Sequence, residues 1–102
     1  MDLVDSKHIL IVGFGITGKS IANYCIKKKI PFSIYDQKLS TEDIKQSPLS
    51  DLAKNIYSGL LTEDMFKGVD GVAMSPGVDP RNPIFKKIKQ SGTLFFNDLD
   101  LF

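Results

Sequence analysis

Residues 13–20, with the sequence GFGITGKS, are the part of this chain whose residue types and spacing best suit chemistry. They come directly after the apolar run of residues 8–12, HILIV. A buried strand that passes through a glycine turn into a helix can bind a phosphate with backbone groups alone, because the first N–H groups of a helix have no partner within it and carry partial positive charge. Glycine lets the backbone come close to the ligand. The pattern therefore predicts a loop that binds a nucleotide.

Two known loop patterns match these eight residues. Gly13, Gly15 and Gly18 fit the GxGxxG fingerprint of dinucleotide-binding folds. Gly13 and Gly18, followed by Lys19 and Ser20, also fit the phosphate loop of nucleotide triphosphatases. The two loops differ in shape, so only one of these interpretations can hold.

Residues farther along the chain favour the fingerprint. It expects an acid at the end of the second strand, about 20 residues on, and Asp36 stands there. A triphosphatase expects an acid at the end of a later strand to hold magnesium, but residues 73–75 end the fourth predicted strand without one. We therefore expect Lys19 to begin a helix and to point to solvent.

Besides the glycine loop, two predicted strand ends carry candidate binding residues. Asp36 can accept a hydrogen bond from a ribose hydroxyl or a base N–H, although an acid at a strand end can also be merely solvated. Gln37 and Lys38 offer donors to the same ligand, and Lys38 also suits the phosphate of NADP. Residues 75–77, SPG, form either a plain turn or a stiff surface on which a flat base can lie.

The pattern of apolar runs and breakers predicts the elements that position these residues. We predict strands over residues 8–12, 31–36, 55–59, 69–74 and 93–96, with helices over residues 17–28, 62–66 and 82–91 and one short helix near residues 49–53. Another helix could begin at residues 98–102. Strands that alternate with helices imply an α/β, Rossmann-like parallel five-stranded sheet with helices on both faces, and ligands bind such sheets at the carboxyl ends of the strands.

Other residues are predicted to have structural roles. Gly18, Ile21, Ala22 and Cys25 recur at the spacing of one helical face, so Cys25 should pack as a small apolar group. Thr62 and Asn82 are expected to cap helices, Pro31 to end the first helix, and the pair of phenylalanines at residues 95–96 to lie in the core.

Composition narrows the class of protein. A chain of 102 residues makes one domain, and its net charge of +1 points to neither nucleic acid nor membrane as a partner. A lone cysteine and the absence of a signal-peptide core at residues 1–5 suggest the cytoplasm. The sequence shows no nucleophile–base set and no metal-ligand spacing. We expect a binding domain without catalytic residues of its own.

The motifs together resemble the N-terminal domain of the Mur ligases, and within that family the MurD type. The resemblance rests on residues 11–20, 35–36, 73–78, 82–83 and 97–102, which span nearly the whole chain. Its most specific part is the SPG turn, since dinucleotide folds in general do not require one. The resemblance implies that residues 1–102 are a single N-terminal domain that binds the UDP end of UDP-N-acetylmuramoyl-L-alanine.

The resemblance also implies what lies elsewhere in such a ligase. Ligases of this family have a second domain for ATP and magnesium and a third for the incoming amino acid, and they add D-glutamate through an acyl phosphate during peptidoglycan synthesis. The fragment alone should therefore be inactive, need no cofactor of its own, and work with the rest of its ligase chain.

Specific positions follow from the same resemblance. Ile16 and Thr17 match residues that contact the substrate phosphates, Asp36 matches the acid at the uridine, and Gly77 matches the glycine beside the uracil. Gln37 and Lys38 stand where the family often has threonine and arginine, and lysine stacks on a base less well than arginine. The predicted UDP site is Gly15, Ile16, Thr17, Asp36, Gln37, Lys38 and Gly77.

Three alternatives remain open at this point. The same loop and acid suit an NAD(P)-binding Rossmann domain of a dehydrogenase or a regulatory protein. A small triphosphatase module and a scaffold domain with a vestigial loop also remain.

Overall fold

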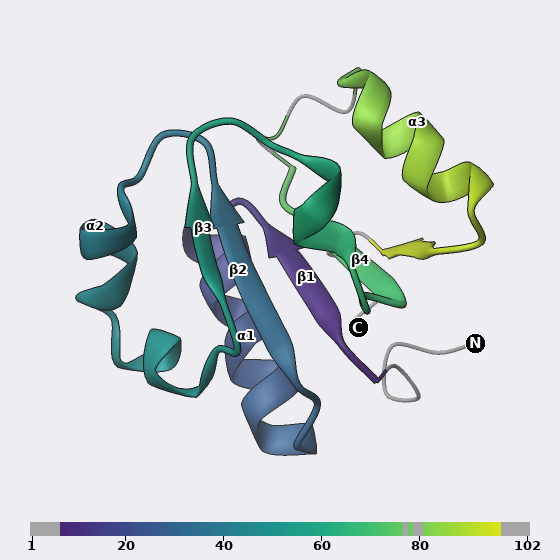
Figure 1. Cartoon of the computed structure of the whole chain (residues 1–102). Coiled ribbons are helices and arrows are strands. Elements are labelled where there is room, and N and C mark those ends of the chain that lie inside the picture. The colour runs from purple at the N-terminus through teal and green to yellow at the C-terminus, as the bar shows by residue number, and fades with distance from the viewer. Residues whose placement is uncertain (1–6, 77, 79–80, 97–102) are drawn as a thin grey trace.

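The computed structural model describes residues 7–76, 78 and 81–96, and its five strands form one parallel sheet in the order β3-β2-β1-β4-β5 (Figure 1). The strands are β1 (Ile9–Val12), β2 (Phe32–Asp36), β3 (Ile56–Ser58), β4 (Gly71–Met74) and β5 (Leu94–Phe96). The helices are α1 (Ile16–Lys28), α2 (Thr41–Lys45) and α3 (Pro83–Gln90), with short 3₁₀ helices η2 (Pro48–Leu52) and η3 (Glu63–Phe66). The predicted Rossmann-like α/β sheet is confirmed.

The central strand β1 is buried along its whole length. Its side chains alternate between two apolar clusters: Ile9 and Ile11 contribute to one, and Leu10 and Val12 contribute to the other. A strand covered on both faces is apolar at every position, which is why residues 8–12 read as an unbroken run rather than an alternating one.

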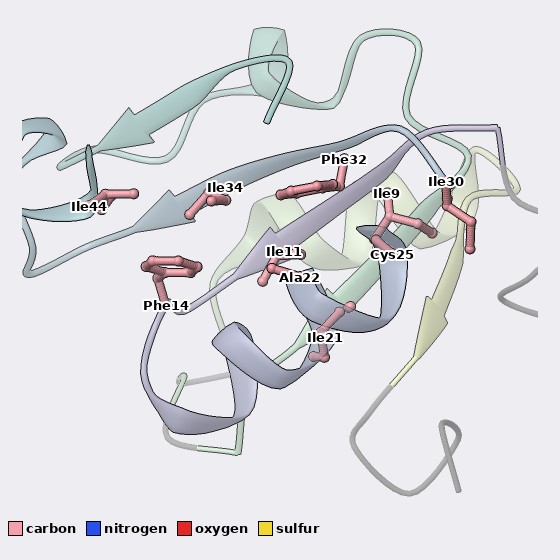
Figure 2. Packing of buried hydrophobic residues seen from close by; sticks show 11 residues of the cluster. Ile9, Ile11, Phe14, Ile21, Ala22, Cys25, Ile30, Phe32, Ile34 and Ile44 are labelled. Atoms are coloured by element: carbon pink, nitrogen blue, oxygen red, sulfur yellow. The ribbon is translucent and has the colours of Figure 1, made fainter. Parts of the chain in front are cut away.

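Helix α1 covers the first face of the sheet. Its buried residues are Gly18, Ile21, Ala22 and Cys25, the face that the helical spacing predicted. Figure 2 shows Ile21, Ala22 and Cys25 packed with side chains of β1 and β2. Burial raises the pKa of the Cys25 thiol to about 12, so it packs as a neutral, small apolar group.

Three aromatic rings pack together on the second face of the sheet. Phe85 of α3 lies between Phe66 of η3 and Phe95 of β5, in edge-to-face contacts with ring centroids 6.4 and 6.2 Å apart. Asn82 caps α3 as predicted, since its side-chain oxygen accepts a hydrogen bond from the N–H of Ile84 at 3.0 Å. None of the helices in the described part of the chain is long and apolar enough to cross a membrane.

The stretch between β2 and β3 differs from the sequence prediction. It holds two short elements, α2 and η2, where one helix was expected. The side chain of Ser40 accepts from the N–H of Asp43, which begins α2, and Ile44 is fully buried beneath it. One apolar anchor per turn is too weak a periodic signal to reveal so short a helix. Thr62 precedes η3 but makes no capping hydrogen bond with its side chain.

The end of α1 at Lys28 agrees with the predicted helix over residues 17–28. The structure adds a detail that the sequence did not reveal: Lys29, two residues before Pro31, closes the helix in the left-handed conformation, with φ at 58°. The N–H of Lys29 bonds back to Ile26, and that of Ile30 bonds to Cys25 at 2.8 Å. Glycine is the usual residue at such a cap, since a Cβ is strained there.

We predict that Lys29→Gly stabilises the protein. Removal of the Cβ relieves the left-handed strain and should raise the free energy of unfolding by about 0.5–1 kcal/mol, measured by urea or thermal unfolding. Lys28→Gly is the matched control: it lies inside α1 and should cost about 1 kcal/mol. A loss of stability in both variants would contradict the cap.

Candidate functional site

A cleft of about 970 Å³ lies at the carboxyl ends of the strands. The loops after β1, β2, β3 and β4 all contribute to its walls. Six of the residues predicted from sequence line it: Gly15, Ile16, Thr17, Asp36, Gln37 and Lys38. The seventh, Gly77, lies outside the described residues. The fold therefore brings together residues from four loops that are separate in the sequence.

The three glycines of the loop have separate tasks. Gly13 has φ at +93°, and a Cβ there would lie 2.8 Å from Val78. A Cβ on Gly18 would lie only 2.0 Å from the carbonyl oxygen of Gly13, so this glycine lets α1 pack directly against the end of β1. A Cβ on Gly15 would meet nothing within 4 Å. The open position is the one at which the fingerprint needs a close approach by phosphate.

The N-terminus of α1 faces this open position with unused donors. The first hydrogen bond of the helical pattern runs from the N–H of Lys19 to the oxygen of Gly15 at 2.9 Å. The N–H groups of residues 16–18 come before this bond and have no partner within the helix. Gly15 provides no side chain to cap them, and the first turn carries no acid. Together with the helix dipole, these groups form a surface suited to an anion.

The carboxylate of Asp36 is held by three backbone N–H groups. Oδ2 accepts from Phe14 at 2.8 Å, and Oδ1 accepts from Lys38 at 2.8 Å and from Leu39 at 2.9 Å. Partial burial by itself would raise the pKa of Asp36, but these hydrogen bonds and the charge of Lys38 outweigh it and hold the pKa below its ordinary value. Asp36 is therefore ionised at neutral pH, and much of its acceptor capacity is used within the protein.

Ser75 holds the glycine loop from the opposite side. Its hydroxyl donates to the oxygen of Gly13 at 2.8 Å, and its N–H donates to the oxygen of Val12 at 3.0 Å. The N–H of Gly13 in turn donates to the oxygen of Tyr35 at 2.7 Å. The sequence singled out the SPG turn as a surface for a base, but it did not reveal this serine as an anchor of the loop.

The wall formed by the loop after β3 was also missed. Tyr35 donates its hydroxyl to the oxygen of Gly59, and the N–H of Gly59 donates to the oxygen of Asp36 at 3.3 Å. Leu60 then projects into solvent at the cleft with 82% of its surface exposed, as Ile16 does with 89%. The rule that ligands bind at the carboxyl ends of strands could have found this loop, because β3 was predicted.

Lys19 lies away from the cleft. Its side chain is exposed, and its Nζ is 5.8 Å from the centre of the Phe14 ring, beside a separate hollow that includes Asp43. The described residues also contain no group of three or more His, Cys, Asp or Glu side chains that could hold a metal ion. The lysine of a phosphate loop must reach the phosphates, but Lys19 lies outside the cleft, so the geometry favours the fingerprint over the phosphate loop.

The fold and the sequence were compared with those of known proteins. The solved structure of shikimate dehydrogenase from Aquifex aeolicus is similar with a TM-score of 0.62 over 96% of this chain and 44% of that one. At 14% identity, this likeness concerns the fold alone.

Curated relatives carry the name UDP-N-acetylmuramoylalanine–D-glutamate ligase. One from Nitrosomonas europaea is 30% identical over 96 residues, which are 94% of this chain and 20% of that protein. One from Buchnera aphidicola subsp. Schizaphis graminum is 36% identical over 98 residues, which are 94% of this chain and 21% of that protein. The chain thus spans about a fifth of the length of these relatives.

A family model described as Mur ligase MurD-like, N-terminal domain, matches residues 7–96. The match takes in all five strands and every loop that lines the cleft. The chain belongs to the family of MurD-like N-terminal domains of Mur ligases.

Proposed function

We propose that this domain binds the UDP end of UDP-N-acetylmuramoyl-L-alanine, as the N-terminal part of an ATP-dependent ligase that adds D-glutamate to that substrate. The observation that carries the proposal is the single cleft that joins the glycine loop to Asp36, Gln37 and Lys38 in a chain of the MurD-like family. The relatives are named for this substrate and this amino acid.

The diphosphate would lie at the N-terminus of α1. The N–H groups of Ile16 and Thr17 have no partner within the helix there, and Gly15 leaves room for a phosphate to come close. The ammonium group of Lys38 and the guanidinium group of Arg81 both line the cleft and favour a dianion. The nucleoside would extend towards the end of β2.

The domain's own contribution would be binding and orientation. A substrate held at its UDP end presents its other end to the remaining part of the ligase, and fixing that orientation lowers the entropic cost of the reaction. ATP, magnesium and the acyl-phosphate chemistry are proposed for the rest of the ligase chain. We place this function in the cytoplasm.

We predict that UDP and UDP-N-acetylmuramoyl-L-alanine shift the amide signals of residues 15–18 and 36–38 in an NMR titration. The shifts should persist in Lys19→Ala, because Lys19 lies outside the cleft. Tighter binding of NADH than of UDP would favour a nicotinamide site instead. Magnesium-dependent ATP binding that Lys19→Ala abolishes would favour the triphosphatase, and no binding of any nucleotide would favour a scaffold.

We further predict that one glycine substitution mainly weakens UDP binding and that another mainly lowers stability. In Gly15→Ala the new methyl group meets no protein atom, so the free energy of unfolding should fall by no more than about 1 kcal/mol. The methyl group does occupy the space assigned to the phosphate, so UDP should bind about tenfold more weakly, which corresponds to about 1.4 kcal/mol.

Gly18→Ala is the matched variant, because its methyl group would collide with the backbone oxygen of Gly13. It should lose about 1–3 kcal/mol of stability, as overpacked positions do. Chemical unfolding and calorimetric titration with UDP measure both effects. Unchanged UDP affinity in a folded Gly15→Ala variant would argue against phosphate at this loop.

A further inference from the structure

We propose that Asp36 is a positioning residue for the phosphate site: its carboxylate fastens the glycine loop to the loop after β2 and so sets the direction of the amides that would face the diphosphate. The sequence had assigned this acid to the nucleoside alone. The effect on binding rests on the proposed function, whereas the fastening itself can be tested without any ligand.

The contacts of the two carboxylate oxygens carry the proposal. Oδ2 accepts from the N–H of Phe14, which stands between Gly13 and Gly15 in the glycine loop. Oδ1 accepts from Lys38 and Leu39 in the loop after β2. One side chain thus joins the two segments that supply most of the predicted binding residues.

The remaining acceptor capacity of Asp36 is small. An ionised carboxylate has about four acceptor positions, and three are used by the protein. Since Oδ1 already accepts two hydrogen bonds, Asp36 cannot grip both hydroxyls of a ribose with one oxygen each. A single ligand donor, at Oδ2, is all that it can accept, so its main task is to hold the loop.

The glycine loop needs such an anchor. The buried ring of Phe14 holds the side chain between Gly13 and Gly15 in the core, and the hydrogen bond from the N–H of Phe14 to Asp36 holds the backbone of the same residue. A loop that is ordered before the ligand arrives avoids the entropic cost of becoming ordered upon binding. Ser75 anchors Gly13 from the β4 side, and Asp36 anchors the next residue from the β2 side.

The protein should remain folded when this anchor is weakened. The ring of Phe14 is buried in the apolar cluster beneath the sheet, and the core contains no part of Asp36. In Asp36→Asn, one oxygen can still accept from the loop after β2, but the amide NH₂ then faces the N–H of Phe14, and two donors cannot bond. If the amide is turned the other way, its oxygen accepts from Phe14, and the hydrogen bonds from the N–H groups of Lys38 and Leu39 are lost instead.

The decisive measurement compares wild type and Asp36→Asn with two ligands, UDP and inorganic pyrophosphate, by calorimetry or NMR. We expect both ligands to bind Asp36→Asn about tenfold more weakly, because the loss lies in the amides that face the phosphates. Asp51→Asn, an exposed carboxylate of η2 outside the cleft, controls for the change of charge. A loss confined to UDP, with pyrophosphate unaffected, would mean that Asp36 contacts only the nucleoside and would overturn the proposal.

A measurement without ligand separates this inference from the proposed function. The groups that face the carboxylate are the ammonium group of Lys38 and the phenol of Tyr35. Burial raises the pKa of the Tyr35 phenol above its ordinary value, so this group stays neutral in acid. The amide signals of Phe14, Lys38 and Leu39 should therefore shift together as the Asp36 carboxyl is protonated, with a midpoint below the ordinary aspartate value of 3.8. Asp36→Asn should abolish this common transition.

Stability should follow the same titration. The pKa of Asp36 is lower in the folded than in the unfolded protein, so its contribution is fully present above the unfolded value and is lost as the pH falls through the folded value. The difference in Tm between wild type and Asp36→Asn should thus be constant near neutral pH and shrink in acid. If the amide signal of Phe14 does not shift together with those of Lys38 and Leu39, the anchor is absent. If UDP and pyrophosphate both fail to bind the wild type, the proposed function fails. The titration of the amide signals still shows whether Asp36 fastens the loop.

Discussion

The close contact between the end of β1 and the start of α1 is the constraint on which the rest of the structure depends. A Cβ at Gly18 would lie 2.0 Å from the oxygen of Gly13, so only glycine allows the helix to turn back onto the strand at this distance. That return buries Ile21, Ala22 and Cys25 against the sheet. It also leaves the first N–H groups of α1 at the carboxyl end of β1, where they are free of the helical pattern.

The sheet order turns this local arrangement into a cleft. The chain places β2 on one side of β1 and β4 on the other, so the loops that leave these strands diverge around the glycine loop. Asp36 fastens that loop from one side and Ser75 fastens it from the other. The glycine loop is thus bonded on both sides, to a side chain at the end of β2 and to one in the loop that follows β4.

The lining of the cleft combines charged residues with backbone donors. Its charged residues are Asp36, Lys38 and Arg81, and the described residues of its wall include no His or Cys that could serve as a nucleophile. The free thiol of Cys25 is buried and its pKa is raised, so it is unsuited to act as one. These observations agree with membership of the MurD-like family of N-terminal domains, in which the chain corresponds to about a fifth of the curated relatives.

The elements that could be predicted were those with a strong local signal. The apolar run of β1, the glycine loop, the buried face of α1 and the Asn82 cap all follow from side-chain periodicity and from hydrogen bonds between near neighbours. Helix α2 was missed because Ile44 is its one buried residue. The end of α1 at Lys28 was predicted, but the left-handed conformation of Lys29 was not, because a lysine in that conformation carries no composition signal.

The sequence by itself determined which residues gather at the strand ends, because the alternation of strands and helices places every strand's carboxyl end at one edge. Only the tertiary structure decided which of those residues form hydrogen bonds with one another. The pairing of Asp36 with Phe14, of Ser75 with Gly13 and of Tyr35 with Gly59 joins positions far apart in the chain. Such contacts depend on which strands become neighbours and on where each backbone N–H points, and neither is written in local periodicity.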